Sequence, residues 1–205
     1  IDVGQGDSIL IQTPAGENML IDAGNPEEGD KVVNYLKNQG VRDLEAVVAT
    51  HPHADHIGGL PAVFKALPVA RVYMPGVTYS SELFGQLLQV IKDKGLKINM
   101  ARAGVNIPLN GIKAGFIAPV NDHYEDINNY SAVVRVDYGE NSFILAGDAQ
   151  TPSEDEMLGA GSLSRAQVLK VGHHGSADSS SPAFLKAVAP EYAIIMCGSG
   201  NDYGG

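Results

Sequence analysis

Hydrophobic and polar positions follow two periodicities along the chain, one typical of strands and the other of helices. Residues 8–13 and 18–24 are apolar runs on either side of the turn PAGEN, which predicts a β-hairpin. Residues 26–40 place Val32 and Leu36 on one face and end in glycine, which predicts an amphipathic helix. The alternation then continues with strands at 44–50 and 69–75 and helices at 56–67 and 80–95.

Strands dominate the second half of the chain. The pattern predicts strands at 97–101, 112–119, 130–139, 141–148, 166–176 and 192–198, and helices at 153–161 and 181–190. Because nearly continuous apolar strands need cover on both faces, mixed sheets packed under helices are the expected arrangement. We predict a single α/β domain over residues 1–205, without a long linker or a repeat of fixed period.

Composition and charge limit the classes of function. The chain has 14 Lys and Arg against 24 Asp and Glu, and the resulting formal charge of −10 disfavours tight non-specific binding of nucleic acid. The single cysteine, Cys197, excludes an internal disulfide framework but leaves the redox compartment open. The longest apolar runs are far shorter than the roughly 20 residues of a membrane-spanning helix. Six scattered basic residues are interpreted as solvated surface charges: Lys31, Lys37, Arg71, Arg102, Arg135 and Lys170.

The densest chemistry lies in residues 49–59, ATHPHADHIGG, directly after an apolar strand. Residues two apart in an extended segment point the same way, so His51 and His53 present their imidazoles together, as a divalent transition metal requires. Asp55 and His56 follow where the chain turns into a helix, and they could hold a second ion nearby. Each residue alone would be interpreted as polar loop sequence or a helix cap. The four together favour a metal site.

Two further strands end in residues of the same type. FILAGD, residues 143–148, ends on Asp148, which is placed either to bridge two ions or to cap the next helix. LKVGHHGS, residues 169–176, carries His173 and His174 between two glycines. Because active sites of such folds collect where strand ends meet at one edge of a sheet, we predict that the three clusters share one pocket.

The motifs HPHADH, AGD and GHH, in this order and at these separations, resemble the metallo-β-lactamase superfamily. The opening DVGQGDS, with IDAG and KVGHHGS, narrows the resemblance to ComEC-type competence proteins, whose membrane channel passes single-stranded DNA into bacteria. The resemblance covers nearly the whole chain. It implies an αββα sandwich, with two mixed β-sheets flanked by helices, around a site for two divalent ions, Mn²⁺ or Zn²⁺.

The resemblance also implies roles for single residues. It assigns metal ligands as follows: His51, His53 and Asp148 to the first ion, and Asp55, His56, the bridging Asp148 and His173 to the second. His174 is left ambiguous, because it either replaces His173 as the ligand or contacts the substrate phosphate. It is also the candidate acid for the leaving group, so the expected catalytic residues are Asp55, Asp148 and His174.

Further residues are expected to line the pocket or to orient ligands. Asp22, in IDAG, resembles an aspartate that orients a metal-bound histidine, and it could equally be a turn residue. Asp7, in GQGDS, either lines the pocket floor or belongs to a tight turn. The superfamily's additional metal-binding histidine is matched only by His123, which we interpret as a loop residue. The ComEC type carries Asn-x-x-Ser instead, matched by Asn128 and Ser131, and the more open first site favours oxygen-loving Mn²⁺.

The function implied by the resemblance is that of a metal-dependent nuclease domain, which degrades the DNA strand that is not transported, using water activated by two ions. DNA is then a weakly bound substrate, kept close because the domain is tethered to the transmembrane channel domain of the same parent chain. We expect the domain at the outer face of the cytoplasmic membrane, and the fragment to be a monomer.

Two alternatives stay open. One is a hydrolase of another phosphodiester or ester, similar to the phosphorylcholine esterases of the superfamily, and the other is a non-catalytic metal-binding domain that docks on the channel. The chain opens on Ile1 without a methionine, and we expect it to be a piece of a longer membrane protein. The family continues from N-x-Y-G into a histidine and a proline, whereas this chain ends NDYGG, so we expect a substrate-facing histidine and a closing helix to be missing.

Overall fold

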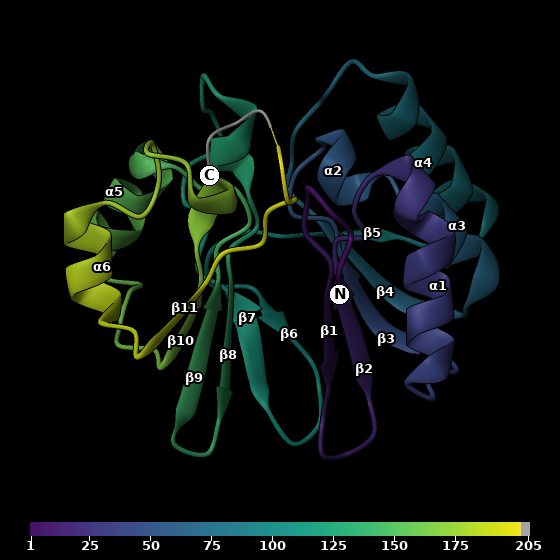
Figure 1. Ribbon diagram of the computed structural model, residues 1–205, viewed down its shortest axis with the longest axis horizontal. Helices are drawn as coiled ribbons and strands as arrows, with labels where there is room; N and C mark the ends of the chain where they lie inside the picture. Colours follow the sequence, from purple (N-terminus) through teal and green to yellow (C-terminus); the bar gives the residue numbers. More distant parts are fainter. Residues whose placement is uncertain (202–205) are drawn as a thin grey trace.

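Two β-sheets pack face to face, and helices cover both outer faces, so the layers follow the order α, β, β, α (Figure 1). This arrangement confirms the sandwich of two mixed sheets expected from the sequence. The computed structural model describes residues 1–201, and the expectation about the NDYGG end falls mostly on residues outside the described ones. No helix among residues 1–201 is long and apolar enough to cross a membrane.

The first sheet has five strands in the order β1-β2-β3-β4-β5. Its strands are β1 Ile9–Gln12, β2 Asn18–Ile21, β3 Leu44–Val48, β4 Val69–Met74 and β5 Ile98–Met100. The predicted hairpin is confirmed, because β1 pairs antiparallel with β2, while β2, β3, β4 and β5 run parallel to one another. The helices of this half are η1 Pro26–Glu28, α1 Gly29–Asn38, α2 Ala54–Ile57, α3 Leu60–Ala66 and α4 Glu82–Asp93.

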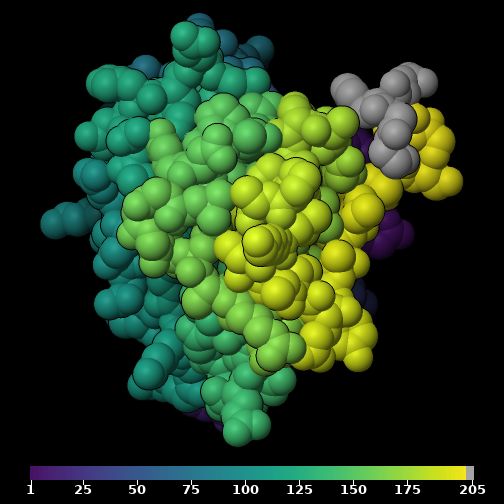
Figure 2. All heavy atoms as spheres, turned by 90° about the vertical axis from the view of Figure 1, so that its left-hand side faces the viewer, coloured from purple at the N-terminus to yellow at the C-terminus, as the bar shows by residue number. Residues whose placement is uncertain are grey.

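The second sheet has six strands in the order β11-β10-β9-β8-β7-β6. Its strands are β6 Asn106–Ile107, β7 Lys113–Phe116, β8 Val134–Tyr138, β9 Asn141–Leu145, β10 Val168–Lys170 and β11 Tyr192–Ile194. Strands β9, β10 and β11 are parallel, whereas β6 to β9 are antiparallel. The helices of this half are η2 Ile127–Tyr130, α5 Thr151–Gly159, η3 Gly172–Gly175 and α6 Pro182–Val188. Figure 2 shows the face that α5 and α6 cover, in green to yellow.

Alternation along the strands builds three apolar layers. In β3, Val47 faces the layer under α1, α3 and α4, whereas its neighbours Ala46 and Val48 face the layer between the two sheets. In the other half, Phe184 of α6 is fully buried against the outer face of the second sheet. Each large side chain buried in this way contributes roughly 1.5–3 kcal/mol to folding. The layers hold both sheets rigidly enough to carry a site between them.

The expected helix at 56–67 is wrong in one respect, because the structure has two short helices, α2 and α3, instead of one. The break falls at Gly58 and Gly59, where the loop that follows β2 packs directly on the helix junction. A Cβ on Gly59 would lie 2.2 Å from the carbonyl oxygen of Ala23, so no side chain fits there. This close approach also brings the neighbouring Asp22 within 2.8 Å of Nδ1 of His56.

The expected strand at 166–176 is also too long. Pairing ends at Lys170, and the chain turns into the 3₁₀ helix η3. His173 and His174 have φ of 42° and 52°, in the left-handed region that ordinary residues rarely adopt. The two histidines therefore lie on a tight turn beyond the strand, at the same edge of the sandwich as the ends of β3 and β9 (Figure 1).

Candidate metal centre

His51 and His53 follow β3 and form the first group of candidate ligands. His51 is buried and His53 is half-buried. Their nitrogens converge, with Nε2 of His51 3.0 Å from Nδ1 of His53. Oδ2 of Asp148 lies 3.6 Å from the same Nε2 of His51, so residues from both sheets meet at one point. The ligand atoms of these three residues all lie within 4.8 Å of one another.

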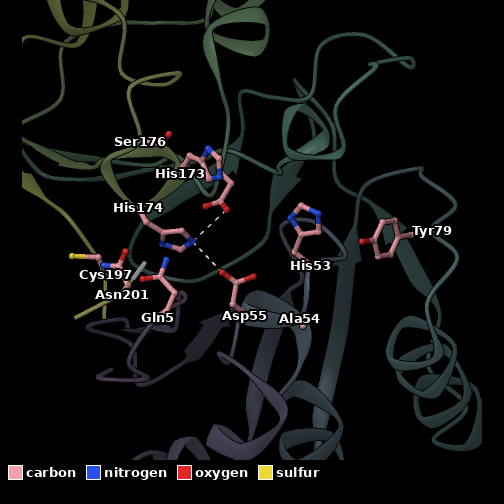
Figure 3. A pocket seen from close by; sticks show the side chains of 11 residues that line it. Gln5, His53, Ala54, Asp55, Tyr79, His173, His174, Ser176, Cys197 and Asn201 are labelled. Atoms are coloured by element: carbon pink, nitrogen blue, oxygen red, sulfur yellow. Dashed lines mark ion pairs between the residues drawn. The ribbon is translucent and has the colours of Figure 1, made fainter. Parts of the chain in front are cut away.

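A second group lies beside the first and consists of Asp55, His56 and His174. Nε2 of His56 lies 3.1 Å from Oδ2 of Asp148, and Nε2 of His174 lies 3.3 Å from that oxygen. Asp55 extends from α2 and places Oδ2 3.3 Å from Nε2 of His174 (Figure 3). The two groups therefore share one oxygen atom, Oδ2 of Asp148.

His174, not His173, is the histidine that the structure brings to this cluster. His173 turns away: Nδ1 bonds to Oδ1 of Asp178 at 2.9 Å, and Nε2 lies 3.4 Å from the amide nitrogen of Asn128. Asn128 is buried, and its Oδ1 has no hydrogen-bond partner among the described residues. No signal in the sequence separates the two neighbouring histidines, because the left-handed turn at both residues decides where each side chain points.

Asp148 stands at the centre because of the backbone around it. It follows β9 after Gly147, whose φ of 54° makes the turn, and a Cβ on Gly147 would lie 3.2 Å from the side chain of Ser131. The hydroxyl of Ser131 accepts the backbone N–H of Asp148 at 3.0 Å and lies 3.4 Å from Nδ1 of His51. Ser131 therefore connects Asp148 and His51, two of the three residues of the first group. The N-terminal cap of α5 is Gln150, so Asp148 does not cap that helix, which was the other role that the sequence allowed for it.

Asp22 orients His56. Its carboxylate accepts three hydrogen bonds, from the backbone N–H of Thr50 at 2.9 Å, from the Thr50 hydroxyl at 2.6 Å and from Nδ1 of His56 at 2.8 Å. A carboxylate can only accept, so Nδ1 of His56 carries a hydrogen and a neutral ring presents its electron pair at Nε2, toward Asp148. Asp22 thus has the orienting position that the sequence left open. His123 is exposed and belongs to neither ligand group.

Lys170 is the largest departure from the sequence prediction. We interpreted it as a surface charge, which is wrong, because only 2% of the residue is exposed. Its ammonium lies 2.5 Å from Oδ2 of Asp7, 2.8 Å from the carbonyl oxygen of Gly147 and 3.7 Å from Oδ1 of Asp148. Asp7 is equally buried as the partner of Lys170, and it is not one of the described residues that line the pocket. The alternation in β10 could have predicted this burial: Leu169 faces α5 and α6, so its neighbour Lys170 must face the space between the two sheets.

Charges in the cluster stabilise one another. Burial disfavours a charged His174, but its hydrogen bonds to Asp148 and Asp55 outweigh burial and raise the pKa to about 9. Burial also opposes charge on His56, and the carboxylates of Asp148 and Asp22 nevertheless raise its pKa well above the ordinary value. Burial alone would raise the pKa of Asp55, but the hydrogen bond from His174 and the charge of His56 lower it to about 2. Protons thus hold the cluster together until a cation replaces them.

A pocket of about 440 Å³ opens onto this cluster (Figure 3). His53 and Tyr79 form one side, with the hydroxyl of Tyr79 directed toward His53, and their rings meet edge to face at 5.8 Å. The opposite side is polar and lies beyond His174, and it is formed by Gln5, Ser176, Cys197 and Asn201. Apart from the histidines, none of these wall residues was expected in the pocket. Gln5, Ser176 and Asn201 lie within the motifs DVGQGDS, KVGHHGS and NDYGG but had no assigned role, and Tyr79 and Cys197 lie outside any motif.

The donor set fits divalent ions. Nε2 of His56 and Nε2 of His174 face each other at 3.3 Å, and Nε2 of His51 faces Nδ1 of His53 at 3.0 Å. Neutral imidazoles whose electron pairs converge in this way repel unless a cation lies between them. Oδ1 of Asp148 is buried and has no hydrogen bond within the described part of the chain. Imidazole and carboxylate donors together suit Zn²⁺ or Mn²⁺.

Comparison with known proteins identifies relatives. Residues 1–199 match the family model described as the metallo-beta-lactamase superfamily. ComE operon protein 3 of Bacillus subtilis (strain 168) is 30% identical over 220 residues, which cover 99% of this chain and 28% of that protein. Competence protein ComA of Neisseria gonorrhoeae is 33% identical over 210 residues, which cover 98% of this chain and 27% of that protein. The chain therefore spans about a quarter of the length of these curated relatives.

A solved structure supports the fold independently. A diphosphatase from the PhnP family superposes with a TM-score of 0.53 at 18% identity, over 92% of this chain and 71% of that chain. At this identity the likeness shows the arrangement of the layers alone.

Proposed function

This chain belongs to the metallo-β-lactamase superfamily, and on that premise we propose that it is a metal-dependent phosphodiesterase that cuts DNA during DNA uptake. The observation that carries the proposal is the meeting of two ligand groups on one oxygen atom, Oδ2 of Asp148. Two divalent ions roughly 3.5–4 Å apart, when bound, activate water and stabilise the negative charge that develops on an attacked phosphate. The competence relatives support DNA as the substrate.

We assign the ligands from the geometry. His51, His53 and Asp148 would hold the first ion, and Asp55, His56, His174 and the shared Asp148 the second. The ions proposed are Mn²⁺ or Zn²⁺. His173 is reassigned from metal ligand to support of the pocket wall, because its two ring nitrogens face Asp178 and Asn128.

The balance of charge favours two ions over one. The carboxylates of Asp7, Asp22, Asp55 and Asp148 and the ammonium of Lys170 leave three negative charges when the imidazoles are neutral. One divalent ion would leave one negative charge, which repels a phosphodiester anion. Two divalent ions reverse the sign and leave one positive charge, which attracts it.

Asp55 and His174 have separate tasks in this proposal. The carboxylate of Asp55 lies at the pocket mouth, where it would bind the second ion and accept a hydrogen bond from the attacking water. His174 has no nitrogen free for a leaving group, because Nδ1 bonds to the carbonyl oxygen of Met196 at 2.8 Å and Nε2 points into the cluster. The leaving group therefore takes its proton from solvent through the open pocket.

Weak binding of DNA fits the surface around the pocket. Its lining within the described residues contains neither lysine nor arginine, and the chain carries a net charge of −10. We therefore infer that a tether concentrates the substrate, with the domain joined to the transmembrane channel of its parent chain and facing the outside of the cytoplasmic membrane. As an isolated fragment the domain would be a monomer, and within its parent chain it would degrade the strand that is not transported.

The same acidic lining favours a second candidate, a hydrolase of a small phosphodiester or ester that needs no basic groove. The two candidates share the metal centre and differ only in the size of the substrate. A purely docking role for the metal centre is the third outcome that the experiment must separate.

The test uses the 205-residue chain with Mn²⁺ or Zn²⁺, assayed on bis-p-nitrophenyl phosphate and on linear DNA. We expect both substrates to be hydrolysed, and Asp148→Ala to abolish both activities by removing the shared oxygen. Asp30→Ala is the matched control, because Asp30 is exposed on α1, away from the cluster. Turnover of the small diester with intact DNA would favour the second candidate. Stoichiometric metal binding without any turnover would leave only docking.

A further inference from the structure

Lys170 is a buried cation that the proposed reaction does not use. It is the last residue of β10 and faces the space between the two sheets, with 2% of its surface exposed. Removing an ammonium group from water costs several kcal/mol unless its hydrogen bonds are replaced. A lysine at this position therefore needs partners that satisfy it, and the identity of those partners indicates what it does.

The ammonium has three hydrogens and three oxygen neighbours. Oδ2 of Asp7 lies at 2.5 Å, the carbonyl oxygen of Gly147 at 2.8 Å and Oδ1 of Asp148 at 3.7 Å. Two of these atoms belong to the turn that presents the shared carboxylate. Asp7 comes from the segment before β1, so the contact also ties the first sheet to the end of β10.

The two oxygens of Asp148 have different surroundings. Oδ2 lies within 3.6 Å of imidazole nitrogens from His51, His56 and His174. Oδ1 faces Lys170 and has no hydrogen bond within residues 1–201. A carboxylate can rotate about its last torsion with little resistance, so a fixed charge on one side is needed to keep the other oxygen directed at the imidazoles.

We propose that Lys170, held by Asp7, is a positioning residue for the metal centre: it attracts Oδ1 of Asp148 and fixes the preceding carbonyl, so that Oδ2 alone is presented to both ions. The inference rests on the proposed function, because it concerns the same ligand groups. Lys170 touches neither ion nor substrate and acts through Asp148.

A purely structural role would make a different prediction. If the Lys170–Asp7 pair only stabilised the fold, removing both charges together would leave the metal centre unchanged, because no unpaired buried charge would remain. Lys170→Met alone leaves Asp7 unpaired and is expected to unfold much of the protein. The double variant Lys170→Met with Asp7→Asn avoids that problem by removing both charges together. The single variant Asp7→Asn is measured beside it, because Oδ1 of Asp7 also lies 3.5 Å from Nδ1 of His174 and the effect of that contact must be subtracted.

The experiment compares the wild-type 205-residue chain, the Lys170→Met/Asp7→Asn variant and a control, Arg165→Met/Glu191→Gln. The control removes an exposed ion pair of 2.7 Å and the same two charges. Each protein is titrated with Mn²⁺ by calorimetry, and the loaded protein is examined by electron paramagnetic resonance. Wild type and control should bind two ions with the exchange-coupled signal of Mn²⁺ ions that share an oxygen atom. The double variant should lose that coupled signal and bind its second ion at least tenfold more weakly.

Crystal structures of the ion-free wild type and double variant provide a readout without metal. We expect the Asp148 carboxylate to rotate in the variant and to stay in place in the control. An unrotated carboxylate, or a coupled signal and second-ion affinity within twofold of wild type, would overturn the positioning role. Uncoupled ions in the wild type would overturn it as well. Coupled ions without hydrolysis would refute only the proposed function, so the two failures can be told apart.

Discussion

Asp22 offers a sharp test of the metal centre, because a change of one atom should weaken metal binding while the fold survives. Its Oδ1 accepts the backbone N–H of Thr50, and its Oδ2 accepts both the Thr50 hydroxyl and Nδ1 of His56. In Asp22→Asn the amide oxygen must stay with the Thr50 backbone, which cannot reorient. The NH₂ group then replaces Oδ2 and faces His56 as a donor.

The size of the effect follows from the hydrogen on His56. To accept from the new NH₂ group, a neutral ring must move its hydrogen from Nδ1 to Nε2, the nitrogen directed at Asp148. A cation must then displace that hydrogen, and losses of such orienting partners typically weaken metal binding about 10–100-fold, or about 1.4–2.8 kcal/mol. The free energy of unfolding should fall by only about 1–3 kcal/mol, because asparagine has the same shape and tolerates the φ of 55° at this position.

Competition for Zn²⁺ against a chromophoric chelator measures the affinity, and ¹⁵N NMR of the metal-free protein, at a pH where the ring is neutral, reports which nitrogen of His56 carries the hydrogen. Asp30→Asn serves as the control, since it removes the same charge from an exposed position. An affinity within twofold of wild type, with the hydrogen still on Nδ1, would refute the reasoning. Global unfolding of Asp22→Asn in the absence of metal would also contradict it.

Two further predictions concern the histidines. His174→Ala should remove one ion site, whereas His173→Ala should retain both, because Nε2 of His174 lies 3.3 Å from Oδ2 of Asp148 and His173 is directed toward Asp178. A Mn²⁺ titration counts the bound ions. The opposite result would return His173 to the ligand set. The stability of the ion-free protein should fall as pH rises from 6.5 to about 9. The ordinary pKa of a histidine is 6.5, and the pKa of His174 in the folded protein is about 9. The stabilisation by charged His174 is therefore complete below pH 6.5 and lost above pH 9. That contribution is about 3 kcal/mol, which corresponds to a fall in Tm of roughly 6–12 °C in thermal melts, and a flat profile would contradict it.

Much of the site could be predicted from the sequence because strand periodicity and ligand chemistry coincide. The apolar runs that end at Val48 and Leu145 identify buried strands, and the residues directly after them carry the imidazoles and the carboxylate. The sequence therefore places His51, His53 and His56 after one strand and Asp148 after another; because β3 and β9 lie in different sheets, the packing of the two sheets brings these residues together. The geometry brings all four within one cluster.

Other features depend on close contacts between distant segments. The two glycines at 58–59 read as part of one continuous helix, whereas the loop from β2 leaves no room for a side chain there and divides it. Likewise, the pocket wall is assembled from distant loops: Gln5 lies in the motif DVGQGDS and Tyr79 lies in a loop without a motif, and only packing brings both to the pocket.

By itself, therefore, the sequence determined the layered fold, the identity of most candidate ligands and the strand ends that carry them, because periodicity is a local property. Only the tertiary structure directs the ring of His174 toward Asp148 and that of His173 toward Asp178, since two successive left-handed residues set the direction of each ring. It alone also revealed Lys170 as an internal cation, because the partner that makes its burial tolerable, Asp7, reaches it only when the two sheets pack together.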